Sequence, residues 1–263
     1  MSGNWGSLSS FRATGEAVVD AIGQRIRTEN RIKRGGTVSP IYGDAMIDLA
    51  VRHEKELRRM LLEQYNQTVP AHVRAWARNV PGFASGESFP RLLSLLGHPR
   101  IATPYKWVEG DRHVRVLVPD GEPFERTLRQ LWQYAGCGDP EVVPAKNMSQ
   151  AELMACGKRT VIRPILFTFS TYLVMQHKRF ESVAASRYWK VFEQAKREAA
   201  GKIHQRQCQN RKRPPLRSNG CGTVAHPEWG APGSPWRPGH CDMHAHRIVA
   251  KEFLRDLYNV CEE

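Results

Sequence analysis

Cysteine and histidine residues near the end of the chain have the types and spacing of metal ligands. Cys241 and His244 stand three positions apart, and Cys208 and Cys221 lie upstream of them. Structural Zn²⁺ takes four ligands of this kind, thiolate sulfurs and imidazole nitrogens. The four residues therefore predict a structural zinc site of Cys-Cys-Cys-His type. The alternative interpretation stays open: an irregular loop in which the cysteines pack as small apolar groups.

The histidines upstream of this segment show no ligand spacing, and we expect them to be structural or surface residues. They are His53, His72, His98, His113, His177 and His204.

A turn rich in glycine is the second feature with chemical potential. The sequence from Val80 to Gly86 reads Val-Pro-Gly-Phe-Ala-Ser-Gly, between a predicted helix over 71–79 and another over 86–96. Such a turn lets backbone N–H groups approach a phosphate closely. Gly82 and Gly86 are the expected contacts in this helix-hairpin-helix-like element. A plain helix connector is the alternative, since Gly and Pro mark turns everywhere.

Further motifs follow this turn in order along the chain. They are a leucine-rich helix over 89–97, the stretch Leu131-Trp132-Gln133-Tyr134-Ala135-Gly136, and the stretch from Met148 to Lys158. In this order they resemble the C-terminal transposase domain of the bridge-RNA-guided insertion-sequence transposases, the IS-one-ten family. The resemblance covers roughly residues 75–180 and, more loosely, the last helix. It implies a DNA-binding transposase or recombinase of a mobile element. The implied partners are DNA, a structured guide RNA and further copies of the chain.

The resemblance also implies a catalytic residue. In that family a serine of this domain forms a covalent link to DNA during strand exchange, and Ser149 matches it. Such a serine needs cations that stabilise the phosphorane-like transition state. Lys146, Lys158, Arg159 and Arg163 are the expected source of positive charge.

A structural role for Ser149 stays open as well. The sequence Ser149-Gln150-Ala151-Glu152 has the form of a capping box, in which the serine caps a helix and the glutamate reaches back to it. The two roles are compatible, because a serine at a helix N-terminus also lies where a phosphate binds.

One part of the family's pattern has no counterpart in the sequence. The family carries an N-terminal RuvC-like nuclease domain whose acidic residues bind divalent metal, and such a domain needs about 100 residues or more. Only about 75 residues precede the glycine-rich turn, and they predict helices. Mg²⁺ is therefore expected only if a separate RuvC-like subunit supplies the acidic site.

The charge of the chain points to a polyanionic partner. The formal net charge is +13 and the isoelectric point is near 9.8, values typical of nucleic-acid-binding proteins. Arg211, Lys212 and Arg213 form a basic run, and Arg247 and Lys251 lie on one face of the predicted last helix. We expect these residues to contact phosphates, which gives salt-dependent affinity without sequence readout.

Three functional classes follow from these observations. The first is a serine-dependent transposase, and the second is a non-catalytic helix-hairpin-helix protein that binds DNA or RNA. The third is a zinc-stabilised structural protein of a mobile element. No apolar stretch reaches the length of a membrane span and no signal pattern opens the sequence. We therefore expect a cytoplasmic protein without a membrane partner.

The fold expected from periodicity is mainly α. Three segments are predicted: an N-terminal helical region over 1–70 with the alternative of a coiled coil, a transposase-like domain over 71–200, and a basic region with a final helix over 201–263. The strand pattern over 107–118 predicts one small β-hairpin.

The further predicted helices span 16–29, 44–67 with Asp44 as N-cap, 124–134, 149–156, 165–175 as a buried helix, 186–199 and 242–260.

Overall fold

The computed structural model describes residues 5, 8–34, 40–80, 86–102, 105–109, 115–119, 121–138, 161–176, 183–205, 221 and 226–262. Within these residues the protein is mainly helical, with small antiparallel β-elements, as the sequence predicts. Packing divides the chain into two compact units. The first contains Met1–Asn79, Phe83–Ile165 and Leu257–Glu263, and the second contains Val80–Gly82 and Leu166–Asp256. The three predicted segments stay a prediction.

The described helices, in chain order, are α1 (Leu8–Lys33), α2 (Pro40–Thr68), α3 (Ala71–Asn79), α4 (Ser88–Leu96), α5 (Leu128–Tyr134), α7 (Ile162–Gln176), α8 (Val183–Ala199) and α9 (Pro238–Val260). A 3₁₀ turn, η2, spans Pro227–Gly230. Strand β2 (Tyr105–Glu109) pairs antiparallel with β3 (Arg115–Pro119), with Trp107 opposite Leu117. This is the predicted hairpin. A shorter pair joins β1 (Ile101–Ala102) to β4 (Phe124–Glu125).

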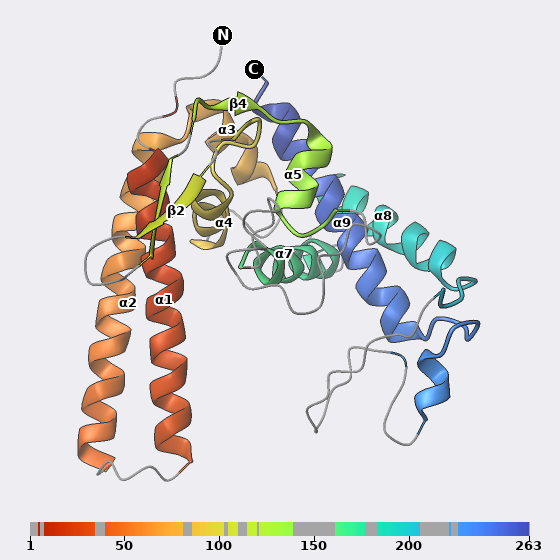
Figure 1. Cartoon of the computed structure of the whole chain (residues 1–263), viewed down its shortest axis with the longest axis horizontal. Helices are drawn as coiled ribbons and strands as arrows, with labels where there is room; N and C mark the ends of the chain where they lie inside the picture. The colour runs from red at the N-terminus through yellow and green to blue at the C-terminus, as the bar shows by residue number, and fades with distance from the viewer. Residues whose placement is uncertain are drawn as a thin grey trace. The chain divides into compact units, whose positions relative to one another are not determined.

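Helix α1 organises the first unit. It lies antiparallel beside α2 and also packs on α4 (Figure 1). Its buried face consists of Phe11, Thr14, Gly15, Val18 and Ala21, at the spacing of one helical stripe. The helix begins earlier and ends later than the predicted 16–29, because this stripe already starts at Phe11 and the last turn continues to Lys33.

Two further boundaries differ from the predictions. Asp44 is not an N-cap, because α2 begins at Pro40, one turn earlier. Phe124 does not open a helix, because it pairs with Ala102 in β4–β1. Instead, Thr127 caps α5 through a capping box with Gln130. The error at Phe124 arises because its strand partner, Ala102, is distant in the sequence.

The contact between α1 and α4 depends on one glycine. A Cβ built on Gly15 would lie 1.9 Å from the Ser94 Oγ and 2.6 Å from its Cβ. The Ser94 hydroxyl donates to the carbonyl of Arg91, at 2.9 Å. Rotation of this hydroxyl alone would not relieve the clash, because the Ser94 Cβ is also too close.

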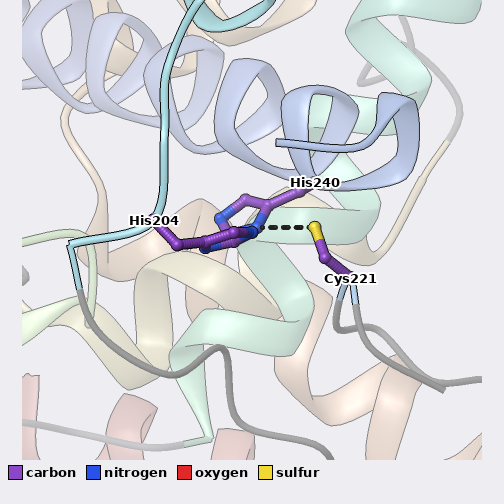
Figure 2. A group of neighbouring side chains, drawn as sticks. All are labelled: His204, Cys221 and His240. Atoms are coloured by element: carbon purple, nitrogen blue, oxygen red, sulfur yellow. Dashed lines mark hydrogen bonds between the residues drawn. The ribbon is translucent and has the colours of Figure 1, made fainter. Parts of the chain in front are cut away.

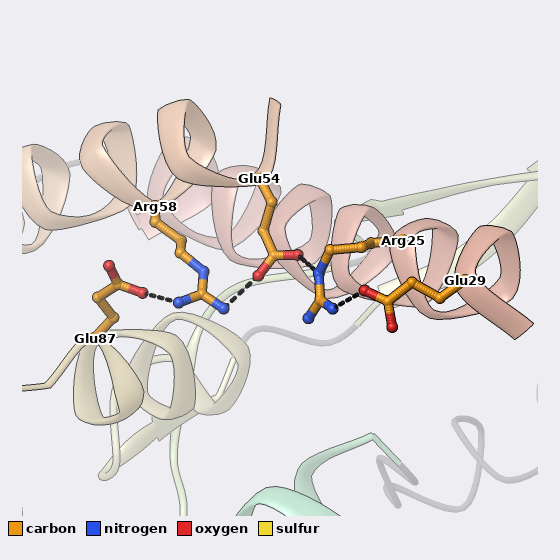
Figure 3. A network of polar contacts seen from close by, with 5 residues as sticks. All are labelled: Arg25, Glu29, Glu54, Arg58 and Glu87. Carbon is orange, nitrogen blue, oxygen red and sulfur yellow. Dashed lines mark hydrogen bonds and ion pairs between the residues drawn. The ribbon is translucent and has the colours of Figure 1, made fainter. Parts of the chain in front are cut away.

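A buried carboxylate joins α1 to α2 and reaches α4 (Figure 3). Glu54 accepts from Arg25 Nε at 2.7 Å and also from Arg58. Arg58 in turn donates to Glu87 at 2.7 Å, and Arg25 to Glu29 at 2.6 Å. Glu54 is only 5% exposed, although it carries a charge. Two guanidinium partners offset the cost of its burial.

The protonation of Glu54 follows from this network. Burial by itself would raise its pKa, but the hydrogen bond from Arg25 and the charge of Arg58 outweigh that effect, and the net pKa is lowered. Glu54 is therefore ionised at neutral pH.

A buried arginine holds the segment that follows α4. Arg126 is 4% exposed and its Nε donates to the Pro99 carbonyl at 2.7 Å. Its Nη2 donates to the carbonyls of both Leu96 and His98. The Tyr258 hydroxyl donates to the backbone carbonyl of Arg126 at 2.9 Å, which ties the end of α9 to the same point.

The second unit buries the inner faces of α7, α8 and α9. Phe169 stacks on Phe253, with ring centroids 5.9 Å apart. The Tyr188 hydroxyl donates to Asp256 at 2.7 Å. Pro164 lies in the first turn of α7, where its missing N–H costs little. The expectation that this helix is buried holds for one face only, because Tyr172 and Met175 are exposed.

Replacing Gly15 with alanine is expected to lower the free energy of unfolding by about 1–3 kcal/mol, because the new methyl group overpacks the α1–α4 contact. This figure already includes the opposing gain of roughly 1 kcal/mol that comes from the higher helix propensity of alanine. Gly23→Ala is the matched control. Its Cβ would meet only the end of the Arg27 side chain, at 3.4 Å, so it should keep the propensity gain. Urea unfolding followed by circular dichroism measures the free energy of unfolding of both variants. If both substitutions stabilise the protein equally, Gly15 does not approach Ser94 closely.

Replacing Glu54 with glutamine is expected to destabilise the protein at neutral pH by about 2 kcal/mol, because the amide has no negative charge and only one acceptor oxygen for the two guanidinium groups. The folded pKa lies below the ordinary value of 4.5. The carboxylate therefore contributes stability above about pH 4.5, and this contribution is lost as the pH falls through the lower folded value. The difference between wild type and variant should shrink in acid.

Glu56→Gln is the control for Glu54→Gln, because Glu56 lies on the same helix with an exposed carboxylate that pairs with Arg59. Chemical unfolding at several pH values measures both variants. If Glu56→Gln lowers the free energy of unfolding as much as Glu54→Gln does, the burial of Glu54 with its arginine partners has no effect on stability.

Candidate functional site

A short backbone pairing places the first residue of the candidate site. Ile203 and Pro235 form an isolated antiparallel bridge. The N–H of His204 donates to the Ser234 carbonyl at 2.9 Å, and the N–H of Gly233 donates to the His204 carbonyl at 2.8 Å. His204 is thereby held against the segment that leads into α9.

Three metal-ligand side chains meet at the start of α9 (Figure 2). They are His204, Cys221 and His240, whose ligand atoms all lie within 4.8 Å of one another. The Cys221 Sγ lies 3.3 Å from the His240 Nδ1. It also accepts from the Arg237 backbone N–H, at 3.4 Å. The chain thus brings three ligands from three separate segments to one point.

The surroundings keep these side chains out of water. His204 is 5% exposed and Cys221 is 3% exposed. Trp236 stacks on the His240 ring, with centroids 4.1 Å apart and planes 12° from parallel. Burial lowers the pKa of His204. Burial also lowers the pKa of His240, with a further contribution from His204 and Arg247. Both rings are therefore neutral at physiological pH, the form that binds metal.

One ring nitrogen in this group has no hydrogen-bond partner among the residues that the structure describes. The Nε2 of His204 is buried and unsatisfied. Buried polar atoms are nearly always paired, and an exception calls for an explanation such as an ion. Zn–N bonds of about 2.0–2.1 Å and Zn–S bonds of about 2.3 Å place tetrahedral sulfur and nitrogen ligands about 3.6 Å apart. The observed Sγ–Nδ1 separation of 3.3 Å is close to that value.

The predicted ligand set is only partly recovered in this group. Cys221 belongs to it, whereas Cys208 lies outside the described residues. Cys241 and His244 do not belong to it. The α9 residue beside Cys221 is His240. Adjacent side chains on a helix point about 100° apart, so Cys241 points in another direction. The Nδ1 of His244 instead faces the Arg247 guanidinium at 3.2 Å. Burial and that guanidinium lower the pKa of His244 to about 4.

His204 and His240 are the two members of this group that the predicted ligand set did not contain. His204 was expected to be a structural or surface residue, since it has no partner at ligand spacing. Its nearest ligand neighbour in the group, Cys221, is far along the chain, and His240 is farther still. The sequence signal for a metal site was the local density of Cys and His residues. That density does not indicate which of these residues are close in the folded chain.

A hollow of about 380 Å³ lies beside the predicted helix-hairpin-helix element. It is bounded by the C-terminal part of α2, by α3 and by the start of α4, with Gly86 on its rim. Arg74 and Arg78 project from α3 into its lining. Arg74 is fixed in place, since its Nε donates to the Val69 carbonyl at 3.0 Å, while Arg78 is exposed. Glu87 also lines the hollow, and it accepts from Arg58.

Some of the other residues predicted to contact phosphate are described in the structure, and the rest are not. Arg163 is exposed at the start of α7. It lies against Gly136, where a Cβ would be 3.2 Å from the Arg163 Cβ and where φ is +76°. Arg247 and Lys251 are half-buried on α9. Outside the described residues lie Gly82, Lys146, Ser149, Lys158, Arg159, Arg211, Lys212 and Arg213.

Among the described helices, none has both the length and the apolar character required to cross a membrane. No known protein family, curated protein or solved structure matches the chain.

Proposed function

We propose that the chain is a DNA-binding protein of a mobile element, of the transposase or recombinase type that its motifs resemble. The observation that carries this proposal is the arginine-bearing hollow beside the glycine-rich turn, between α2, α3 and α4. Helices on both sides of that turn let backbone N–H groups and a helix N-terminus approach a phosphate. Arg78 adds an exposed cation at the same place. The net charge of +13 supports a polyanionic partner independently.

In the proposed reaction Ser149 is the nucleophile. Its Oγ attacks the phosphorus of a DNA phosphodiester, a new P–O bond forms to the serine, and the bond to the leaving strand's oxygen breaks. The hydroxyl proton of the serine leaves with a general base, and the leaving oxygen takes up a proton. Arg163 is the described residue proposed to offset the developing negative charge, together with Lys146, Lys158 and Arg159.

The proposed partners follow from the family resemblance and from strand exchange itself. A separate RuvC-like subunit would supply acidic residues for Mg²⁺, and a structured guide RNA would select the site. Exchange joins two DNA sites, so several copies of the chain would act together in the cytoplasm. We also propose a structural zinc ion, for which Cys208 remains a ligand predicted from the sequence alone.

The alternative is a non-catalytic helix-hairpin-helix protein that binds DNA or RNA. The same hollow and the same charge support it, and it needs neither Ser149 nor a second subunit. The two proposals differ only in whether a covalent protein–DNA link forms.

Replacing Arg78 with glutamine is expected to weaken DNA binding uniformly across sequences, because a phosphate contact is lost. The slope of log K against log salt should become shallower by about 0.9 for that contact. Arg129→Gln, an equally exposed arginine on α5, is the matched control. Fluorescence anisotropy of a labelled duplex over a range of salt concentrations measures both. Equal changes in the two variants would show that only net charge matters and would remove the hollow from the interface.

Replacing Ser149 with alanine is expected to abolish a covalent protein–DNA adduct while leaving salt-sensitive DNA binding intact. The assay mixes each protein with labelled DNA from the ends of the host element, with cellular RNA and Mg²⁺, and resolves the products on a denaturing gel. Ser85→Ala, a serine in the glycine-rich turn, is the control. No adduct from wild type, with or without a RuvC-like subunit, would favour the non-catalytic alternative.

A further inference from the structure

We propose that His204, Cys221 and His240 bind one Zn²⁺ ion through two imidazole nitrogens and one sulfur, and that this ion holds the segment around His204 against the first turn of α9. The ligand assignment rests on the proposed structural zinc ion and is independent of DNA binding. It differs from the set that spacing predicts, in which three ligands are sulfurs and only one is an imidazole.

The donor atoms of the three side chains select the class of metal. They are two imidazole nitrogens and one sulfur, and no carboxylate of the described residues joins the group. Mg²⁺ and Ca²⁺ prefer oxygen ligands, whereas imidazole nitrogen and sulfur suit Zn²⁺. Tetrahedral Zn²⁺ takes four ligands, so the three side chains leave one position for a further ligand.

The distances within the group are close to those of ligands around one ion. The three ligand atoms lie within 4.8 Å of one another. The Cys221 Sγ is 3.3 Å from the His240 Nδ1, near the separation of about 3.6 Å between sulfur and nitrogen ligands of tetrahedral zinc. The His204 and His240 rings have centroids 5.0 Å apart, and Figure 2 shows the Cys221 sulfur beside them. Only modest shifts of these side chains are needed for all three to reach one ion.

A hydrogen bond alone does not account for the group. The contact between the Cys221 sulfur and the His240 Nδ1 pairs those two atoms. The Nε2 of His204 is buried as well, yet it has no hydrogen-bond partner among the described residues. A buried polar atom without a partner carries a desolvation cost, which a bond to a metal ion removes. Within the described part of the chain, the unpaired nitrogen thus belongs to the group of side chains that is suited to a metal ion.

The surroundings hold two of the ligands in place. The backbone N–H of His204 donates to the Ser234 carbonyl at 2.9 Å. Trp236 stacks on the His240 ring, with centroids 4.1 Å apart, and so restrains the plane of that ring. All three ligands belong to the second compact unit. An ion bound to them would stabilise this unit, because the unfolded chain does not hold the ligands together.

The first experiment measures metal binding by the full-length protein. Zinc is counted by plasma mass spectrometry, and Co²⁺ is titrated as a spectroscopic substitute. Wild type should bind one equivalent, and His204→Gln and Cys221→Ala should bind at least about tenfold more weakly. Cys241→Ala is the matched control, because Cys241 is 4% exposed and Cys221 is 3% exposed, but Cys241 lies outside the group. His244→Gln is the corresponding histidine control. Both controls should bind metal as wild type does.

The second experiment identifies the ligands without any variant. X-ray absorption spectroscopy of the zinc-loaded wild type should show two imidazoles and at least one sulfur bound to the ion. The Cys-Cys-Cys-His set would instead show one imidazole and three sulfurs, and that result would overturn the assignment. This measurement does not depend on the folding of a substituted protein.

The third experiment tests the effect of the ion on stability. Thermal unfolding compares wild type treated with a chelator with the same protein at a free zinc concentration of about a hundred times Kd. The melting temperature should rise by roughly 5–10 °C with zinc. Cys221→Ala should show no such rise. One bound equivalent without a rise in wild type would overturn the role of the ion in holding the segment around His204.

The outcomes separate the ligand assignment from the proposed zinc ion. Wild type that binds no metal at one equivalent would overturn both. Metal kept at unchanged affinity by His204→Gln and Cys221→Ala would overturn the assignment alone and leave the zinc ion with other ligands. Neither result bears on the proposed DNA binding, which the Arg78 variant tests.

Discussion

The first unit depends on a buried positive charge. The guanidinium of Arg126 is buried, and burial lowers its pKa to about 10, so it remains charged at neutral pH. A buried cation is tolerated only when its N–H groups are matched by acceptors. The matching acceptors are backbone carbonyls of the segment after α4, among them that of Pro99. Because the same residue's carbonyl accepts from Tyr258, the segment after α4, the β1–β4 pair and the end of α9 must keep their relative positions.

The buried polar groups of the chain satisfy this requirement in different ways. Arg126 relies on neutral carbonyls, and Glu54 relies on two guanidinium groups of opposite charge. At the group of His204, Cys221 and His240, neither solution is present: the rings are neutral and one nitrogen is unpaired. This nitrogen lies beside a thiol and a second imidazole, and that combination is the reason we propose a metal ion there. A metal ion is the ligand whose preferences match two imidazoles and a thiol.

Much of the helical architecture was predictable from apolar spacing. The helices α3, α8 and α9 were expected within a few residues of their observed bounds, and so was the hairpin of β2 with β3. The errors arose where a residue had two plausible local roles. Asp44 suits a cap but lies inside α2, and Phe124 suits a helical face but pairs in a strand. For Phe124 the deciding partner, Ala102, lies outside the window that a periodicity argument reads.

Composition and motif order established a basic, mainly helical protein with a nucleic-acid partner as the leading expectation, because charge and periodicity are properties of the chain itself. They also pointed to the region of the Cys and His residues. They could not choose the members of the metal group, since His204, Cys221 and His240 become neighbours only when the 202–205 segment pairs with 233–236 ahead of α9. Cys241 and His244 have the better spacing, yet ligands are selected by distance and direction in space. Folding alone decides these, because it turns each side chain of α9 toward a different neighbour.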